Sequence, residues 1–415
     1  MKPYEDWWVE DVSNWGVSEW SAWDRLAQSD SEDSFFLDAR SVQALFADSD
    51  RVVSVVVWHE AGERAPAHWV GVAVVEDTWA ESHRLEKHLA SGAGWFAGLS
   101  RMLHGRKGVL RFAVRVVGSV LGSGGHAYRF GAAVPVEQRR NLVGETLERS
   151  LRSAPGPLKP RVALVKDFPK ADVELRIGGA SNWLPNWVDV EFDPIMQLPL
   201  NPAWRSLDDY LGELRTKSRT KVKRILACSE GCSIESLSLP QLEAAIDEVY
   251  ALYRQVYGEA SFRLGTLMPQ DLIEAKRTWG DRFRVDVIRH NDRMVAFYCG
   301  YQTASTVEAF FVGFHRGLNR DLSLYQRMLV EFIRWGIEAN AKQVVMGRTA
   351  LDIKSSIGAL PEGWYCSVWF KNPLLQWGVR LVARHSWPRY AHLKRPWKQD
   401  AYPVLHQGPA RGQWI

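Results

Sequence analysis

The sequence predicts a soluble α/β protein of two domains, with mixed central β-sheets flanked by helices. A chain of 415 residues is too long for one typical hydrophobic core. Its 46% hydrophobic and 24% charged residues are typical of a soluble globular protein. In the second half, residues 306–346 have the pattern of a strand, a long helix and a strand. That order implies a right-handed crossover between two parallel strands.

The second half is organised around residues 306–370. Runs of β-branched and aromatic residues predict its strands, and apolar residues at helical spacing predict its helices. The predicted elements are the strand Thr306–Phe314, a polar turn, a helix through Tyr325 and Trp335, the strand Gln343–Met346, the short helix Ala350–Ile357, and a last strand, Trp364–Phe370, that closes the unit. Ser323 is placed to cap the long helix. Asn340 is placed to end it, because Asn tolerates left-handed backbone.

Upstream of these residues the pattern predicts more helices and a hairpin. Helices Leu239–Gly258 and Pro269–Trp279 precede two strands, Phe283–Arg289 and Met294–Tyr301, which flank a tight turn. With the strand at Thr306, they make three antiparallel strands that lead into the crossover helix.

A basic segment, Leu207–Ala227, comes before these elements. It carries six Lys or Arg residues within residues 215–224, and its apolar residues predict a helix with a cationic face. Such a face is either simply solvated or binds a phosphate-bearing ligand.

The first half also alternates strands and helices. A helix near Ser41–Ala47 precedes the predicted strands Val52–Trp58, Trp69–Val75 and Val109–Val117; the helix Glu137–Arg152 and the strand Arg161–Lys166 follow. A glycine-rich stretch, residues 118–128, is either a phosphate-binding loop or a turn at the domain surface. It lacks the lysine of a P-loop, which favours the turn.

The second half resembles a known family. Residues 205–370 resemble the GNAT-like acyltransferase domain of the FemAB and peptidoglycan-bridge type. The resemblance is carried by the positions Gly313, Gly317, Leu324–Tyr325, Gly347–Arg348, Lys354 and Gly358. It implies two GNAT-like domains, an N-terminal degenerate copy at residues 1–175 and an acyltransferase domain at 176–372. Residues 373–415 then form a basic, Trp-rich amphipathic tail.

Candidate site residues follow from these positions. Glu308 lies on the strand that leads to the crevice and is the candidate general base, and Tyr325 at the helix start is a candidate proton donor. A helix N-terminus favours anions, so the residues expected to hold the acyl donor are Arg316, Gly317, Asn319, Ser323 and Arg348. The residues expected to bind substrate are Lys354, Arg219 and Lys217. Arg348 ends a buried strand and needs an anionic partner there.

The predicted function is N-acyl transfer from acyl-CoA, a co-substrate and not a permanently bound cofactor, to an amine. The acceptor is a soluble amine, a cell-wall precursor or a lipid-like amine. An aminoacyl-tRNA is the alternative donor, although no long helical hairpin of the kind some Fem-type ligases use for tRNA is evident. The loop Arg316–Ser323 departs from the compact phosphate loop of ordinary GNAT enzymes, so a catalytically inactive binding scaffold is the other alternative. No DNA partner is expected.

Charge and cysteine usage bear on partners and compartment. Residues 1–50 hold twelve acidic and three basic side chains, whereas residues 371–415 hold eight Lys or Arg and one acid. The four cysteines form no C-x-x-C pair, so no metal site is expected. The start lacks the pattern of a signal peptide, and no apolar run is long enough to span a bilayer. A cytoplasmic protein is therefore expected.

The tail suggests a second location. Residues 373–387 predict an amphipathic helix with a polar stripe of Gln376, Arg380 and Arg384. Trp377, Trp387 and Trp397 lie among its cations. The helix either docks on the protein's own core or holds the protein peripherally on the inner face of an anionic membrane.

Overall fold

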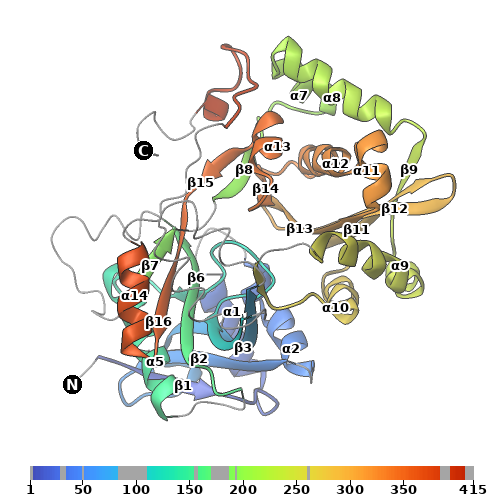
Figure 1. The fold of residues 1–415 in the computed structure, drawn as a ribbon. Coiled ribbons are helices and arrows are strands. Elements are labelled where there is room, and N and C mark those ends of the chain that lie inside the picture. The colour runs from blue at the N-terminus through green and yellow to red at the C-terminus, as the bar shows by residue number, and fades with distance from the viewer. Residues whose placement is uncertain are drawn as a thin grey trace. The chain divides into compact units, whose positions relative to one another are not determined.

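The structure is a computed structural model that describes residues 3–28, 34–48, 51–82, 110–153, 158–169, 187–191, 194–258, 262–383 and 393–406. The chain forms two compact units. The first contains Met1–Phe192, Ser261–Thr266 and Gly363–Trp387, and the second contains Asp193–Ala260, Leu267–Glu362 and Pro388–Ile415. Each unit is a mixed β-sheet flanked by helices (Figure 1), as the sequence predicts.

The second unit is built on a seven-stranded sheet in the order β15-β8-β14-β13-β12-β11-β9. Its strands are β8 (Ile195–Pro199), β9 (Cys232–Ser236), β11 (Phe283–His290), β12 (Arg293–Gln302), β13 (Thr306–Phe314), β14 (Gln343–Gly347) and β15 (Leu360–Glu362). All neighbours are antiparallel except β13 and β14, which are parallel and joined by α12 (Leu324–Glu338). The predicted three antiparallel strands and crossover are confirmed.

Helices cover both faces of this sheet. One face packs against α7 (Leu207–Glu213), α8 (Thr216–Cys228) and α12 in a single core cluster. The opposite face lies against α9 (Leu239–Tyr257) and α10 (Pro269–Trp279) (Figure 1). The short helix α13 (Leu351–Ser356) follows β14. The predicted basic helix is therefore two helices, with Leu214 and Arg215 between them.

Local sequence signals explain how the central elements begin and end. Asn291 and Asp292 have φ angles of 50° and 60°, the left-handed values that a two-residue hairpin turn requires. Asn340 has φ 49°, and the amides of Asn340 and Ala341 donate to the carbonyls of Ile337 and Gly336. These two bonds end α12 in a Schellman motif. The predicted role of Asn340 is confirmed.

The first unit contains a nine-stranded sheet whose main path runs β1-β2-β3-β4-β6-β16-β7. The strands are β1 (Tyr4–Val9), β2 (Val52–Glu60), β3 (Trp69–Ser82), β4 (Leu110–Val117), β6 (Val162–Pro169), β7 (Val188–Glu191) and β16 (Trp364–Phe370), with β5 (Tyr128–Phe130) and β10 (Phe262–Leu264) added beside β3. β4 and β6 are parallel and are joined through α5 (Val136–Ser153). The other pairs on the path are antiparallel.

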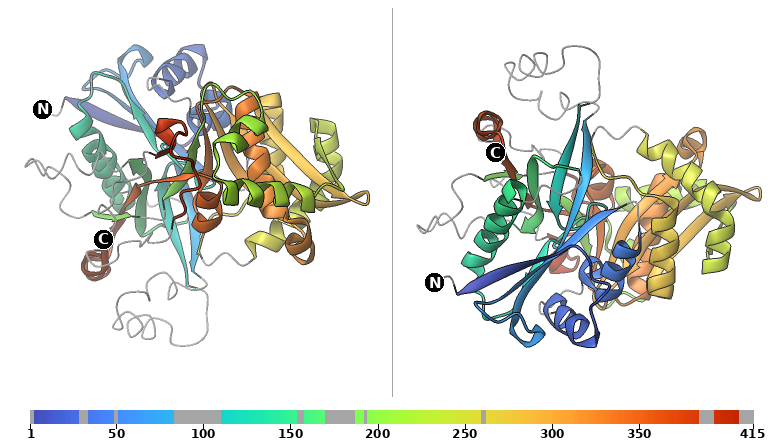
Figure 2. Two further views of the ribbon diagram at one scale, coloured as in Figure 1. Left: turned by 90° about the horizontal axis from the view of Figure 1, so that it is seen from above. Right: turned by 90° about the horizontal axis from the view of Figure 1, so that it is seen from below.

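Alternating residues of β2 pack into two different hydrophobic cores of this unit. Val55 and Val57 pack with α1 (Val17–Ala27) and α2 (Ala39–Ala47), while Val56 and Trp58 pack with α5. The ribbons of these helices can be followed on either side of the sheet in Figure 2. A strand turns successive side chains to opposite faces, so this pattern places helices on both sides of the sheet.

The two sheets have the same topology and exchange strands. Each path has three antiparallel pairs, one parallel pair and two further antiparallel pairs. The sixth position holds β16 in the first sheet, but β8 in the second. The chain thus crosses from β7 to β8 and returns from β15 to β16. This common topology is that of two copies of one fold, whereas the sequence itself shows no clear repeat.

The exchange corrects two expectations. Trp364–Phe370 is a strand with the predicted bounds, but it does not close the second unit, because β16 pairs with β6 and β7 of the first. The compact units change at 192/193 and 362/363, and also on both sides of residues 261–266 and at 387/388, whereas the domain boundaries expected from the sequence are at 175/176 and 372/373. Residues 175 and 176 lie outside the described part of the chain.

The C-terminal tail also differs from its prediction. α14 (Pro373–Ala383) belongs to the first unit, and residues 393–406 belong to the second. Gln376 does not join a polar stripe, because it is buried and its Oε1 accepts the amide of Phe370. Trp397 is 1% exposed and packs on Trp204 and Tyr210. Arg384 and Trp387 lie outside the described residues.

Candidate active site in the second unit

The central feature of the second unit is the opening between β13 and β14. The two strands pair only from Thr306 to Glu308 and from Gln343 to Val345. Both strands continue, β13 as far as Phe314 and β14 as far as Gly347. Beyond Glu308, the edge of β13 therefore no longer pairs with β14, and its backbone groups can pair with an extended ligand.

A β-bulge lies beside this opening. Phe310 and Phe311 of β13 stand opposite Cys299 of β12, and the Cys299 thiol donates to the carbonyl of Phe311 at 3.4 Å. Both rings pack on the α9 face, where Phe310 contacts Tyr301 and Phe311 contacts Tyr253. A bulge bends its strand and redirects side chains. The sequence pattern gave no sign of it.

The two predicted catalytic side chains lie on opposite faces of the sheet. Val307 belongs to the core shared with α12, and Ala309 packs against that core, so Glu308 between them faces α9 and α10. Tyr325 packs on the α12 face, with its ring 6.0 Å from that of Phe314. Burial raises the pKa of Tyr325 to about 12, so its hydroxyl stays protonated near neutral pH.

The start of α12 is built differently from the predicted polar turn. Residues Arg316–Leu322 form a helix, α11. Ser323 then adopts left-handed backbone with φ 51°, and its side chain makes no capping bond. The cap comes from Asn319, whose Oδ1 accepts the amide of Tyr325 at 2.9 Å. The predicted donor-binding residues Arg316, Gly317, Asn319 and Ser323 thus lie together, but Asn319 already serves the helix.

The turn after β14 has strained backbone, and a buried lysine side chain binds it. Gly347, Thr349 and Ala350 have φ angles of 71°, 44° and 51°. Left-handed backbone costs an ordinary residue roughly 1–2 kcal/mol, and it is a rarer conformation still for β-branched threonine. Lys354, 3% exposed, donates its ammonium protons to the carbonyls of Gly347 and Arg348. Strain of this kind concentrates at functional sites.

This geometry changes the expected roles of the two cations. Lys354 does not point its charge into the opening beside Arg348; it binds the backbone of the turn that carries Arg348. Desolvation by burial lowers the pKa of Lys354 to about 7. Arg348 is half-buried and follows the last residue of β14.

The basic helix α8 brings one further cation to α13. Lys221 donates to Ser356 Oγ at 2.7 Å, and burial and the nearby charge of Lys394 lower its pKa. Lys217 is exposed, whereas Arg219 folds back and donates to the carbonyl of Leu214 at 3.1 Å. Lys221 was missed as a candidate, although the basic pattern of α8 includes it.

Packing explains two of the glycines on which the family resemblance rests. A Cβ at Gly313 would lie 2.5 Å from the backbone nitrogen of Tyr253 in α9. A Cβ at Gly358 would lie 1.9 Å from the indole of Trp397. These glycines permit close approach of neighbouring elements.

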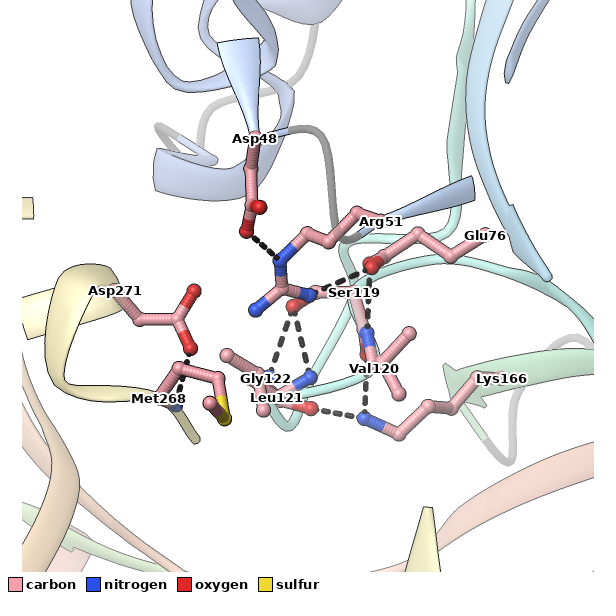
Figure 3. A network of polar contacts seen from close by, with 10 residues as sticks. All are labelled: Asp48, Arg51, Glu76, Ser119, Val120, Leu121, Gly122, Lys166, Met268 and Asp271. Atoms are coloured by element: carbon pink, nitrogen blue, oxygen red, sulfur yellow. Dashed lines mark hydrogen bonds and ion pairs between the residues drawn. The ribbon is translucent and has the colours of Figure 1, made fainter. Parts of the chain in front are cut away.

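The first unit shows no comparable opening in its described residues. β4 pairs with β6 up to its last residue, Val117. In the glycine-rich loop that follows, Glu76 accepts the amide of Val120, and Ser119 Oγ accepts those of Leu121 and Gly122 (Figure 3).

Two residues of β6, just beyond its last pair with β4, complete the closure of this loop. Asp167 accepts the amide of Gly124, and Lys166 donates to the carbonyls of Ser119 and Gly122. Oxygen atoms of the protein thus already accept the amide protons of this loop that a phosphate would need. This supports the turn rather than the phosphate loop.

Comparisons with known proteins find one family model and several solved structures that are similar to this chain. Residues 213–355 match the family model described as an acetyltransferase (GNAT) domain. No curated protein matches the sequence. Among solved structures, the chain is similar to FemX, with 11% identity over 86% of this chain and 98% of that one, and a TM-score of 0.47.

Two other solved structures are similar at the same level. One is a tandem GNAT protein from the clavulanic acid biosynthesis pathway, with 11% identity over 89% of this chain and 99% of that one, and a TM-score of 0.45. The other is L-PGS from Bacillus licheniformis, with 12% identity over 66% and 85% of the two chains and a TM-score of 0.40. The helices among the described residues are too short or too polar to cross a bilayer.

Proposed function

We propose that the second unit, whose residues 213–355 match the family model of an acetyltransferase (GNAT) domain, transfers an acyl group from acyl-CoA to an amine. The observation that carries the proposal is the opening between β13 and β14, whose last shared position is Glu308. Acyl transfer needs an acyl donor held in place and a hydrogen-bond donor for the developing oxyanion. The edge of β13 beyond Glu308 offers backbone amides at fixed positions for both purposes.

Glu308 is the proposed general base. Its carboxylate takes a proton from the acceptor ammonium, directly or through water, and the neutral amine attacks the thioester carbonyl carbon. The carbon–sulfur bond then breaks, the leaving thiolate takes a proton from Tyr325, and the nitrogen that becomes the amide releases its surplus proton, which restores the Tyr325 hydroxyl through solvent. Because Glu308 and Tyr325 lie on opposite faces of the sheet, the acceptor approaches from the α9 side and the thiol leaves towards α12.

The surrounding cations are proposed to hold the donor's phosphates. Arg348 stands at the mouth of the opening, and Lys217 and Arg219 lie at the start of α8. Lys354 acts indirectly, since it fixes the strained turn that carries Arg348. The start of α12 adds the favourable end of its helix dipole for an anion.

An aminoacyl-tRNA is the second candidate donor. The exposed cations on α8, Lys217, Lys223 and Arg224, favour it because a polynucleotide offers many phosphates to such a surface. Its ester carbonyl would occupy the same opening as a thioester. The acceptor is proposed to be a soluble amine, a cell-wall precursor or a lipid-like amine in the cytoplasm.

A panel of acyl-CoA thioesters tests the preferred donor. The pure protein is incubated with each thioester and a set of primary amines, and free thiol is followed over time. Amine-dependent thiol release by the wild type is expected. Glu248→Gln replaces an exposed carboxylate on α9. It is the matched control for Glu308→Gln and should release thiol at the wild-type rate. Release from aminoacyl-tRNA alone would favour the second donor, and release from neither would identify a binding scaffold.

A further inference from the structure

At the start of the helix α14, a polar side chain is buried and three apolar side chains are exposed. The helix lies on β16 and β7 of the first sheet (Figure 1). On its buried side is Gln376, 7% exposed, whose Oε1 accepts the amide of Phe370 at 2.7 Å. On its outer side Leu374, Leu375 and Trp377 are 78%, 43% and 64% exposed. A surface helix normally buries its apolar residues and exposes its polar ones.

These three side chains form the apolar patch of α14. The other large apolar side chains exposed in the described part of the chain lie apart from one another: Val17 on α1, Trp79 on β3, Val136 on α5, and Met268 just before α10. Single exposed apolar residues are ordinary on soluble proteins, whereas a group of them marks an interaction surface. The patch is also anchored, because Asn372 Oδ1 accepts the amide of Leu374 at 2.9 Å and so fixes the start of the helix.

The charged residues of the segment that carries the patch, residues 371–383, are both cations, Lys371 and Arg380. Residues 371–399 contain seven Lys or Arg residues and no Asp or Glu. Two of these cations, Lys371 and Arg380, are at the two ends of α14. An apolar face bordered by cations complements a surface that is anionic outside and apolar beneath. A nucleic acid offers the anions, but leaves the leucines without a partner.

We propose that α14 docks this chain on an anionic lipid surface. The helix lies in the plane of the headgroups, with Leu374, Leu375 and Trp377 at the boundary of the acyl chains. The indole suits this depth, because it is apolar with one polar N–H. The cations add attraction to the anionic headgroups. This inference concerns where the protein works, and it does not depend on the acyl-transfer chemistry.

Flotation of the full-length protein with vesicles tests the proposal. Wild type is mixed with vesicles of phosphatidylcholine alone or of phosphatidylcholine with phosphatidylglycerol. Binding to the anionic vesicles, at least tenfold stronger than to the neutral ones and weakened by salt, is expected. The triple variant Leu374→Gln/Leu375→Gln/Trp377→Gln should lose that binding by at least tenfold.

Two controls make the outcome decisive. Val17→Gln removes a side chain that is 85% exposed on α1, and should bind vesicles like the wild type. The triple variant should keep the wild-type unfolding midpoint and its turnover of any soluble amine substrate. Equal flotation of wild type and triple variant, or no flotation of either, would overturn the proposal.

Discussion

Glu308 and Val345 form the last register pair that β13 and β14 share, and the two strands run on without pairing beyond it. The opening of the second unit therefore begins at a carboxylate. The strained turn at Gly347–Ala350 ends the other side of the opening. A carboxylate, a strand edge that no longer pairs with β14 and a constrained turn thus meet at one end of the sheet.

Arg348→Ala is expected to lower kcat/KM for the acyl donor more than tenfold without changing the fold. Loss of one charge-assisted hydrogen bond to a phosphate is sufficient, because a tenfold change corresponds to about 1.4 kcal/mol. Steady-state kinetics with varied donor would measure it. Arg293→Ala, an exposed arginine at the β11–β12 turn, is the control. Near-normal kcat/KM in Arg348→Ala would place the phosphates elsewhere.

Lys354→Met is expected to change how stability depends on pH. Burial lowers the pKa of Lys354 to about 7, whereas an unfolded lysine titrates near 10.4. Between these values the unfolded chain binds the extra proton, so the free energy of unfolding of the wild type rises with pH. The slope from this group is at most about 1.4 kcal/mol per pH unit, and it vanishes below about pH 7.

Urea unfolding at pH 7, 8 and 9 would measure this difference. The free energy of unfolding of the wild type, relative to that of Lys354→Met, should increase steadily as the pH rises. Lys342→Met, at an exposed position, should run parallel to the wild type. Parallel curves for Lys354→Met as well would mean that Lys354 keeps its ordinary pKa.

Gly358→Ala should destabilise the second unit by about 1–3 kcal/mol, because its Cβ would overlap the indole of Trp397. The φ angle of 103° adds strain for any side chain. Gly212→Ala is the matched control, since a Cβ there meets nothing within 4 Å on α7 and should be neutral or stabilising. Thermal unfolding of both variants would decide. An unchanged midpoint in Gly358→Ala would contradict the docking of Trp397.

The exchanged strands predict that the first unit cannot fold from its N-terminal residues alone. The fragment 1–192 lacks β16, which lies between β6 and β7, so both strands lose their common partner. We expect no cooperative unfolding of this fragment by near-ultraviolet circular dichroism. A fusion that restores residues 363–387 should recover it. Cooperative unfolding of the bare fragment with the same midpoint as the fusion would count against the exchange.

Local signals in the sequence were sufficient for most of the second sheet. The β13 bounds, the hairpin at Asn291 and the end of α12 at Asn340 each depend on neighbours close in the chain, and all three are confirmed. β16 shows the limit of this approach. Its bounds follow from its own residues, but its partner β6 lies some two hundred residues earlier, and nothing local specifies that pairing.

The sequence predicted individual residues of the candidate site better than it predicted their arrangement in space. The sequence pointed to Glu308 and to the start of α12. It did not show that Glu308 and Tyr325 lie on opposite faces, because the bulge at Phe310 and the packing of each face are tertiary features. It also gave Lys354 a free charge, whereas burial turns that ammonium to two backbone carbonyls.

The pH dependence of amine-dependent thiol release by Glu308→Gln is the most direct test of the proposed site. Glutamine keeps the shape of the side chain but removes the base, so turnover near pH 7 should fall at least tenfold. The loss should shrink as the pH approaches the pKa of the amine, because more acceptor is then already neutral. Wild-type turnover of Glu308→Gln at neutral pH, or an equal loss at every pH, would contradict the role of Glu308 as the base.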